Sequence, residues 1–312
     1  MVVVAIAGGT GNVGRTIVET LIESAKHRVI VLGRGESSST STTAACLVVV
    51  NYTDVDATAQ LLKQHQVHTV ISTIQVANED TSVAEVNLIK AAELAGSVKR
   101  FIASGWGALP NERSPAIAFQ RASDGELRKT KLEWTRFVVG FFLDYYGIPY
   151  IKTHLPPMSF AVDMANKKAA IPGTGEELIA LTYSFDLAKF VTAFLDLSCW
   201  EEVTYCYGEK TTWNAFIEVA ENVIGSRFEV TYDPIEKLLE GKVTELPSHK
   251  KELAMSPFPE PIARQLLAIL GVWSVGGQFD IPIDKALNQK FPKIRPMSVY
   301  DMLLYRQKAQ IN

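Results

Sequence analysis

Cysteine is scarce in this sequence, and a cluster of basic residues is missing from it. The 312 residues include three cysteines, Cys46, Cys199 and Cys206, without Cys-x-x-Cys spacing. This pattern indicates neither a disulfide framework nor a metal site, and it favours a reducing compartment. The formal net charge is −3 and Lys and Arg are spread along the chain, so the sequence offers no surface for nucleic acid.

Long apolar runs are also missing. No stretch approaches the roughly 20 apolar residues of a membrane span. The apolar start Val2–Ala7 is too short for the core of a signal peptide, lacks a basic flank and runs directly into glycines. Hydrophobic residues make up 47% and charged residues 21%, the balance of a globular chain. We therefore expect a cytoplasmic protein that makes no membrane contact.

The first half of the chain alternates short β-branched runs with helical patterns, which is typical of strand–helix units in a parallel sheet. The runs lack strict polar alternation, as expected when helices cover both faces of the sheet. The predicted strands are Val2–Ala7, Arg28–Leu32, Leu47–Val50, Thr69–Ile74, Arg100–Ala103 and Leu132–Val139. The predicted helices are Val13–Ser24, Asp56–His65 and Ser82–Ala95.

A glycine-rich turn follows the first predicted strand. The run from Gly8 to Gly14 satisfies both G-x-G-x-x-G and G-x-x-G-x-x-G. Such glycines allow a tight turn, a close approach of backbone to a pyrophosphate, and tight packing of helix on strand. Between a strand and an amphipathic helix, the motif predicts a dinucleotide site. The residues expected to contact the cofactor here are Gly8, Thr10, Gly11, Asn12, Val13 and Gly14.

The end of the second predicted strand bears on which dinucleotide binds. NAD-binding proteins carry an acidic residue there for the ribose hydroxyls, whereas this chain has Gly33-Arg34-Gly35. A guanidinium pairs with a phosphate, so Arg34 favours NADP(H), and Ser37 and Ser38 could add hydroxyl donors. The alternative is that Arg34 is a solvated surface residue.

Prolines become frequent from about Tyr150 and divide the chain into shorter elements. We predict a Rossmann-type doubly wound α/β domain over residues 1–150 that binds NADP. A smaller, mainly substrate-binding lobe is expected over residues 151–312. The short apolar segments Leu178–Tyr183 and Val203–Tyr207 could still return to the main sheet.

Several segments of the chain resemble the NmrA-like and isoflavone-reductase-like branch of the atypical short-chain dehydrogenases, particularly its fungal members. The likeness covers nearly the whole chain. The segments that carry it are Gly8–Gly14, Gly33-Arg34, Val70–Ile74, Arg100–Gly107, Leu132–Thr135, Gly140–Tyr146, the Asp186 segment and Thr212–Asn214.

The resemblance implies which residues meet the ligands. It places the ends of the fourth and fifth strands beside the cofactor, with Ser72, Thr73, Ile74, Ser104 and Trp106. It also implies that the segment after the sixth strand lines an apolar substrate pocket, and the alternative is that these aromatic residues are core. The residues expected to contact substrate are Trp106, Phe141, Phe142, Tyr145, Tyr146 and Met158.

The catalytic group is harder to assign. The Tyr-x-x-x-Lys pair of ordinary short-chain dehydrogenases is not found, and the lysine of the isoflavone-reductase branch falls on Gln120 or Arg121. The position of the family's acidic residue after the fifth strand is Gly105. The remaining candidates for catalysis are Arg121, which can stabilise an oxyanion, His154, whose ordinary pKa is near neutral, Ser104 and Asp144.

Three functions remain open from the sequence. The first is an NADP(H)-dependent reductase of a C=C, C=O or C=N bond in a small, largely apolar natural product. The second is a non-redox isomerase or rearrangement enzyme in which NADP only shapes the pocket, and the missing lysine motivates it. The third is an NmrA-like sensor of the dinucleotide redox state. In each case we expect a monomer or homodimer without metal.

Overall fold

The largest sheet of the fold is parallel. The computed structural model describes residues 1–35, 45–112, 114, 117–256 and 258–311. Across these ranges the sheet has seven strands, all parallel to their neighbours. From one edge to the other they are β11 (Val203–Tyr205), β6 (Glu133–Val138), β5 (Arg100–Gly107), β4 (Val67–Ser72), β1 (Val3–Ala7), β2 (Arg28–Gly33) and β3 (Cys46–Val49). The predicted doubly wound α/β fold is confirmed.

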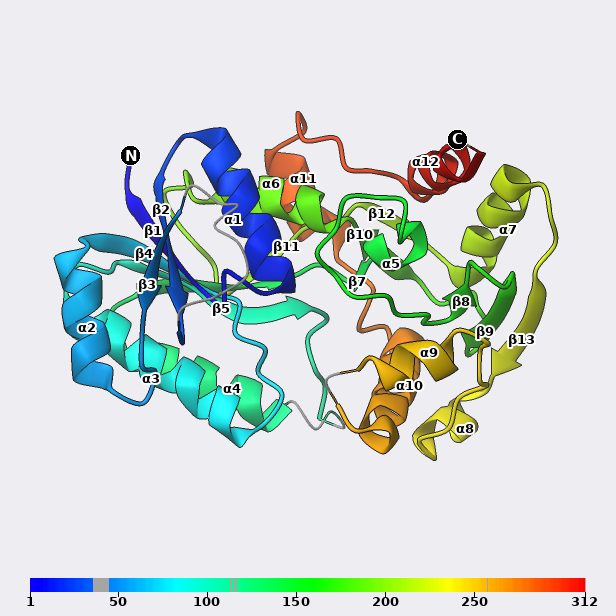
Figure 1. Cartoon of the computed structure of the whole chain (residues 1–312), viewed down its shortest axis with the longest axis horizontal. Coiled ribbons are helices and arrows are strands. Elements are labelled where there is room, and N and C mark those ends of the chain that lie inside the picture. Colours follow the sequence, from blue (N-terminus) through cyan, green and yellow to red (C-terminus); the bar gives the residue numbers. More distant parts are fainter. Residues whose placement is uncertain (36–44, 113, 115–116, 257, 312) are drawn as a thin grey trace. The chain divides into compact units, whose positions relative to one another are not determined.

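Helices cover both faces of this sheet. On one face, α2 (Val55–Gln64), α3 (Glu79–Ala95) and α4 (Ile117–Leu127) lie side by side (Figure 1). On the other, α1 (Asn12–Ser24) packs on β1 and β2, and Phe194 at the end of α6 (Ser184–Phe194) meets Phe137 of β6 edge to face. Burial on both sides explains why the inner strands read as continuous apolar runs, whereas the edge strand β3 is mostly exposed.

The strand order reverses between β1 and β4. From β1 the chain adds β2 and β3 on one side and then returns to build β4, β5 and β6 on the other. Ligands of open parallel sheets bind outside the carboxyl ends of the strands at such a reversal. Both the glycine-rich turn after β1 and the Ser72-Thr73 segment at the end of β4 lie at this position.

The chain divides into two compact units at a different place from the predicted boundary at residue 150. The first unit contains residues 1–138, 187–206 and 284–294, and the second contains 139–186, 207–283 and 295–312. Of the two short segments that could return to the main sheet, Val203–Tyr205 does so as β11 beside β6. The other forms β10 (Ile179–Thr182) in a small sheet of the second unit.

Two small sheets and several helices build the second unit. One sheet has the order β12-β10-β7 and the other β13-β9-β8. The additional strands are β7 (Phe141–Phe142), β8 (Val162–Asp163), β9 (Lys168–Pro172), β12 (Glu209–Thr211) and β13 (Glu229–Asp233). The helices are α5 (Asp144–Gly147), α7 (Trp213–Ile224), α8 (Ile235–Leu239), α9 (His249–Ala254), α10 (Glu260–Val275) and α12 (Val299–Ile311). The 3₁₀ turn η1 (Ile283–Lys285) and α11 (Leu287–Lys290) complete the described chain.

Gly140, just before β7, allows the backbone to approach β10 closely. Its φ is +75°, and a Cβ there would overlap the carbonyl oxygen of Ala180. Gly277 has a matching φ of +76° in the same unit, but a Cβ there would meet nothing within 4 Å. A comparison of alanine substitutions at these two glycines therefore separates the cost of backbone strain from the cost of steric overlap.

We expect Gly277→Ala to lower the free energy of unfolding by roughly 1–2 kcal/mol, the cost of a left-handed non-glycine residue. Gly140→Ala should cost a further 1–3 kcal/mol or so, because a backbone oxygen cannot rotate away from the new methyl group. Urea denaturation of both variants measures the difference. Equal losses would show that the contact with Ala180 relaxes freely.

Candidate functional site

The glycine-rich turn is held against the end of β4 by Thr73. The Thr73 N–H and hydroxyl both donate to the carbonyl oxygen of Ala7, at 2.8 and 2.7 Å. A Cβ at Gly8 would lie 2.8 Å from the Thr73 carbonyl oxygen, and one at Gly14 would overlap the Thr73 hydroxyl and the Gly8 carbonyl. Close packing of the turn on Thr73 is thus what requires glycine at these two positions.

The amino end of α1 presents backbone donors without a side-chain cap. Its N-cap is Gly11, and its first turn contains no acidic residue. By contrast, α2, α3 and α7 are capped by the side chains of Asp54, Asn78 and Thr212. The uncapped N–H groups and the positive end of the helix dipole suit a pyrophosphate, so this turn fits a dinucleotide.

Arg34 follows β2 directly and is exposed. It lies near the buried Tyr52, whose hydroxyl donates to the carbonyl oxygen of Leu32 at 3.2 Å. Burial raises the pKa of the Tyr52 phenol, and the positive charge of Arg34 opposes that rise. Arg34 therefore stands at the carboxyl end of β2 with its charge available to a ligand. Ser37 and Ser38 lie outside the described residues.

The ends of β4 and β5 are linked by hydrogen bonds among the predicted cofactor residues. Ser104 donates its hydroxyl to the carbonyl oxygen of Ile74 at 2.7 Å, and the indole N–H of Trp106 donates to that of Ser72 at 3.0 Å. The Trp106 ring also stacks on Phe137 with centroids 5.5 Å apart. The structure thus brings these four predicted residues together at one edge of the sheet.

Arg121 and Gln120, the two alternatives for the family lysine, have different surroundings on α4. The side chain of Arg121 is 60% exposed and forms an ion pair with Glu112. The Gln120 amide donates to the carboxylate of Asp124 at 3.2 Å. Because Asp124 also binds a buried arginine of the sheet, these contacts favour Gln120 over Arg121 as the α4 residue that faces the sheet edge.

The buried arginine is Arg136 of β6, which the sequence analysis missed. Only 3% exposed, it donates from Nη2 to Asp124 at 2.6 Å and to the Ser123 hydroxyl at 3.0 Å. A Cβ at Gly105 would lie 2.6 Å from Arg136 Nη1, so the guanidinium fills the space that a side chain at position 105 would need. The sequence did contain a signal for this residue, because Arg136 is a charged residue within a strand that is predicted to be fully buried.

Glu85 of α3 is a second buried charged residue that the sequence analysis did not single out. It is 1% exposed and accepts the backbone N–H of Ser104 at 2.7 Å. Burial raises the pKa of its carboxyl, while the charge of Arg136 and the Ser104 N–H act in the opposite direction. Its signal was spacing, because Glu85 stands three residues before Leu88 and four before Ile89 on the apolar face of its helix.

In the second unit, Asp144 has a structural environment. It is fully buried and accepts hydrogen bonds from the Thr153 hydroxyl at 2.6 Å and from the Ser184 hydroxyl and N–H at 2.6 and 2.8 Å. These bonds join α5 to the start of α6 and to the Thr153 segment. Because its oxygens accept these hydrogen bonds and its side chain is not exposed, Asp144 is better suited to a structural role in this unit than to proton transfer.

The aromatic residues predicted to contact substrate divide into two groups. Phe141, Phe142 and Tyr146 are at most 8% exposed, and the first and last belong to the aromatic core of the unit. Tyr146 also donates its hydroxyl to the carbonyl oxygen of Phe160 at 2.9 Å. His154 is half-buried against Phe185, with ring centroids 6.1 Å apart. The burial of Phe141, Phe142 and Tyr146 therefore agrees with the alternative that these aromatic residues belong to the core.

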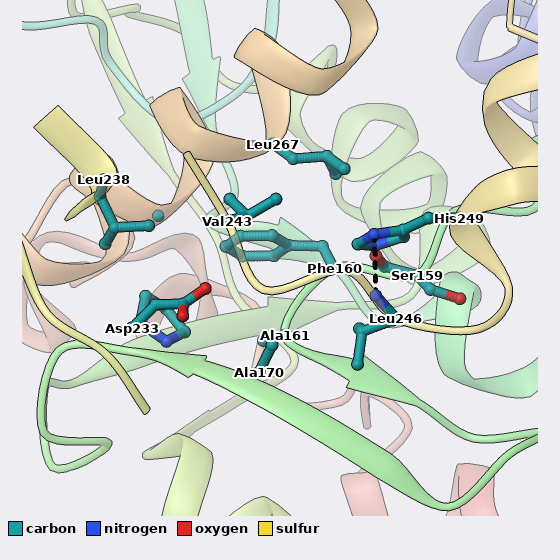
Figure 2. A pocket seen from close by; sticks show the side chains of 12 residues that line it. Ser159, Phe160, Ala161, Ala170, Asp233, Leu238, Val243, Leu246, His249 and Leu267 are labelled. Carbon is teal, nitrogen blue, oxygen red and sulfur yellow. Dashed lines mark hydrogen bonds between the residues drawn. The ribbon is translucent and has the colours of Figure 1, made fainter. Parts of the chain in front are cut away.

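Tyr145 and Met158 instead line a cavity of about 60 Å³ within the second unit, together with Asp163, Glu252 and Arg306. A separate cavity of about 20 Å³ is mostly apolar and contains none of the predicted site residues (Figure 2). Across the described ranges of the chain, no cluster of His, Cys, Asp or Glu could hold a metal ion. No helix in those ranges is long and apolar enough to span a membrane.

Comparison with known proteins gives a consistent picture. The sequence model of the NmrA-like family matches residues 2–303. The chain is 31% identical over 304 residues to Oxidoreductase BOA1 of Botryotinia fuckeliana, covering 95% of this chain and 96% of the relative. It is 28% identical to Oxidoreductase swnN of Metarhizium robertsii, with 96% of each chain covered.

A solved structure has the same fold. Leucoanthocyanidin reductase from Vitis vinifera, in its binary complex with NADPH, superposes with a TM-score of 0.73. The match covers 97% of this chain and 98% of the reductase at 18% identity.

We expect the buried Glu85 to make the stability of the protein pH-dependent. A carboxyl with a raised pKa in the folded state binds more protons there than in the unfolded state, so stability falls as pH rises above the ordinary value of 4.5. Glu85→Gln keeps an acceptor for the Ser104 N–H and should make this fall shallower, by up to about 1.4 kcal/mol per pH unit.

Urea unfolding at a series of pH values between about 5 and 8 measures this effect. The control is Glu79→Gln, which changes an exposed residue of the same helix. Parallel curves for wild type and Glu85→Gln would contradict the assignment.

Proposed function

The chain belongs to the NmrA-like family, as its motifs predicted, and from this premise we propose that it is an NADP(H)-dependent reductase of a small, largely apolar natural product. The observation that carries the proposal is the uncapped amino end of α1, behind a glycine turn packed on Thr73, at the reversal of strand order. The names of the relatives, two oxidoreductases, support a redox activity.

In this proposal the first unit holds the cofactor. The backbone of Gly11 to Gly14 receives the pyrophosphate, and Arg34 pairs with the 2′-phosphate of NADP. Ser72, Thr73, Ile74, Ser104 and Trp106 form the edge beside the remainder of the dinucleotide. When bound, NADPH supplies a hydride to the substrate, and the protein orients both molecules and excludes water.

A polar network lies under this edge. Glu85 accepts from the backbone N–H of Ser104, and Asp124, which is paired with Arg136, accepts from the amide of Gln120. A neutral amide at Gln120 can hydrogen-bond an oxygen or nitrogen of the substrate but is no acid at neutral pH. His154 remains our candidate for a proton donor.

The second candidate function is a non-redox isomerase that keeps NADP to shape its pocket. The observation that favours it is Gln120, one of the two residues on which the family lysine falls, because its neutral amide is bound to Asp124. A reaction that moves a proton within the substrate would need no external hydride. The two functions differ in whether NADPH is consumed.

We expect turnover of a substrate to oxidise NADPH in a one-to-one ratio with product. Candidate substrates are small apolar compounds that carry a C=C, C=O or C=N bond. The decrease of the reduced-nicotinamide absorbance is recorded alongside product formation by mass spectrometry. Product that accumulates while NADPH stays constant would replace the reductase with the isomerase.

We expect Arg34→Ala to weaken NADPH binding about tenfold or more, because a charge-assisted hydrogen bond to the 2′-phosphate is lost. NADH binding should change little. Fluorescence titration of the reduced cofactors measures both affinities. Arg28→Ala is the matched control, since Arg28 is an exposed arginine at the opposite end of the same strand. Equal NADPH affinities for the two variants would remove Arg34 from the site.

A further inference from the structure

The cavity lined by Tyr145 and Met158 contains a buried arginine with donors to spare. Arg306 of α12 is 5% exposed. Its Nη1 donates to the carbonyl oxygens of Tyr146 and Ile148, at 3.3 and 2.5 Å, and its guanidinium carbon lies 5.1 Å from the ring centre of Tyr150. In the described part of the chain, no acceptor forms a hydrogen bond with Nε or Nη2.

Two carboxylates share this cavity, but their oxygens are occupied by other donors. Asp163 accepts from the N–H groups of Ala165, Asn166 and Ser248 and from the Asn166 amide, at 2.9 to 3.1 Å. Burial alone would raise the pKa of Asp163, and these hydrogen bonds lower it below its ordinary value. Glu252 accepts the N–H and hydroxyl of Ser159, at 2.7 and 2.8 Å.

The wall of the cavity at Ser159 is held from one helix. Besides Glu252, α9 supplies His249, whose Nε2 donates to the Ser159 carbonyl oxygen at 2.8 Å while Nδ1 accepts the Leu246 N–H at 3.1 Å (Figure 2). With its N–H, hydroxyl and carbonyl all bonded, Ser159 cannot turn toward Arg306. The cavity is therefore preformed, and its unused donors belong to the guanidinium.

The charges in the cavity select the chemistry of its occupant. An anion would pair with Arg306 but face Asp163 and Glu252, and a cation would face Arg306 and find the carboxylate oxygens already bonded. A neutral group with an acceptor oxygen avoids both costs and satisfies the guanidinium.

We propose that this cavity is a subsite for a neutral oxygen acceptor of the substrate, a carbonyl oxygen for example, which accepts from Nε or Nη2 of Arg306. The assignment rests on the proposed function in so far as Tyr145 and Met158 are predicted to contact substrate. It adds a specificity determinant, Arg306, and a chemical class, a compound with a neutral carbonyl or comparable oxygen.

Methionine methyl groups report on occupancy of the cavity. The chain has six methionines, and two of them, Met158 and Met164, line it. In the full-length protein labelled with ¹³C at the methionine methyls, we expect cyclopentanone to shift these two signals and leave that of the exposed Met255 unchanged. Cyclopentanecarboxylate and cyclopentylammonium, which have the same ring, should bind about tenfold or more weakly.

Variants test the role of Arg306. Arg306→Gln should weaken cyclopentanone binding about tenfold, the loss of a hydrogen bond from a charged donor. Arg227→Gln, at a side chain that is 91% exposed in the same unit, should leave binding unchanged. If Arg306→Gln fails to fold, Ala165→Leu is the second variant. A larger side chain at this exposed lining residue should fill the cavity and prevent cyclopentanone binding, while the arginine stays in place.

The outcomes separate this inference from the proposed function. NADPH binding without any shift at Met158 and Met164 would overturn the subsite and leave the reductase intact. Shifts by cyclopentanone in a protein that does not bind NADPH would retain the subsite and overturn the cofactor assignment. Equal affinity for the ketone and the carboxylate, or full binding by Arg306→Gln, would also overturn the subsite.

Discussion

The carbonyl oxygen of Ala7 accepts two hydrogen bonds from Thr73, and this pairing joins β1 to the end of β4 where the strand order reverses. The glycine turn must then pass within contact distance of Thr73, which leaves no room for a side chain at Gly8 or Gly14. The start of α1 follows this turn with its backbone donors uncapped. The close packing of the glycine turn and the uncapped start of α1 are therefore found at a single close approach.

Sequence reasoning succeeded where local pattern and position determine structure. The predicted strands of the first half, the glycine turn and the family were confirmed because buried parallel strands and their turns are encoded by nearby residues. Contacts between residues that are distant in the sequence were harder to predict. Nothing local indicates that Arg136 of β6 reaches under Gly105, or that Glu85 accepts from the backbone of Ser104. Both contacts depend on which helices and strands become neighbours.

The second unit also has features that could not be predicted from the sequence. An aromatic run such as Phe141 to Tyr146 resembles a pocket lining in sequence, because core and binding aromatics have the same composition. In the structure the two buried phenylalanines and Tyr146 are removed from solvent, whereas Tyr145 lines a cavity. Arg306, which meets this cavity from α12, stands some 160 residues away in the chain. Its role could not be derived from spacing.

The contact between Gly105 and Arg136 restricts the order in which substitutions at these two positions can occur. With Arg136 present, any side chain at position 105 meets the guanidinium and a backbone φ of +148° that disfavours it. If Arg136 is lost first, the half-buried carboxylate of Asp124 loses its charged partner and keeps only the Gln120 amide. Neither single step is neutral, so the two residues should be kept or exchanged together.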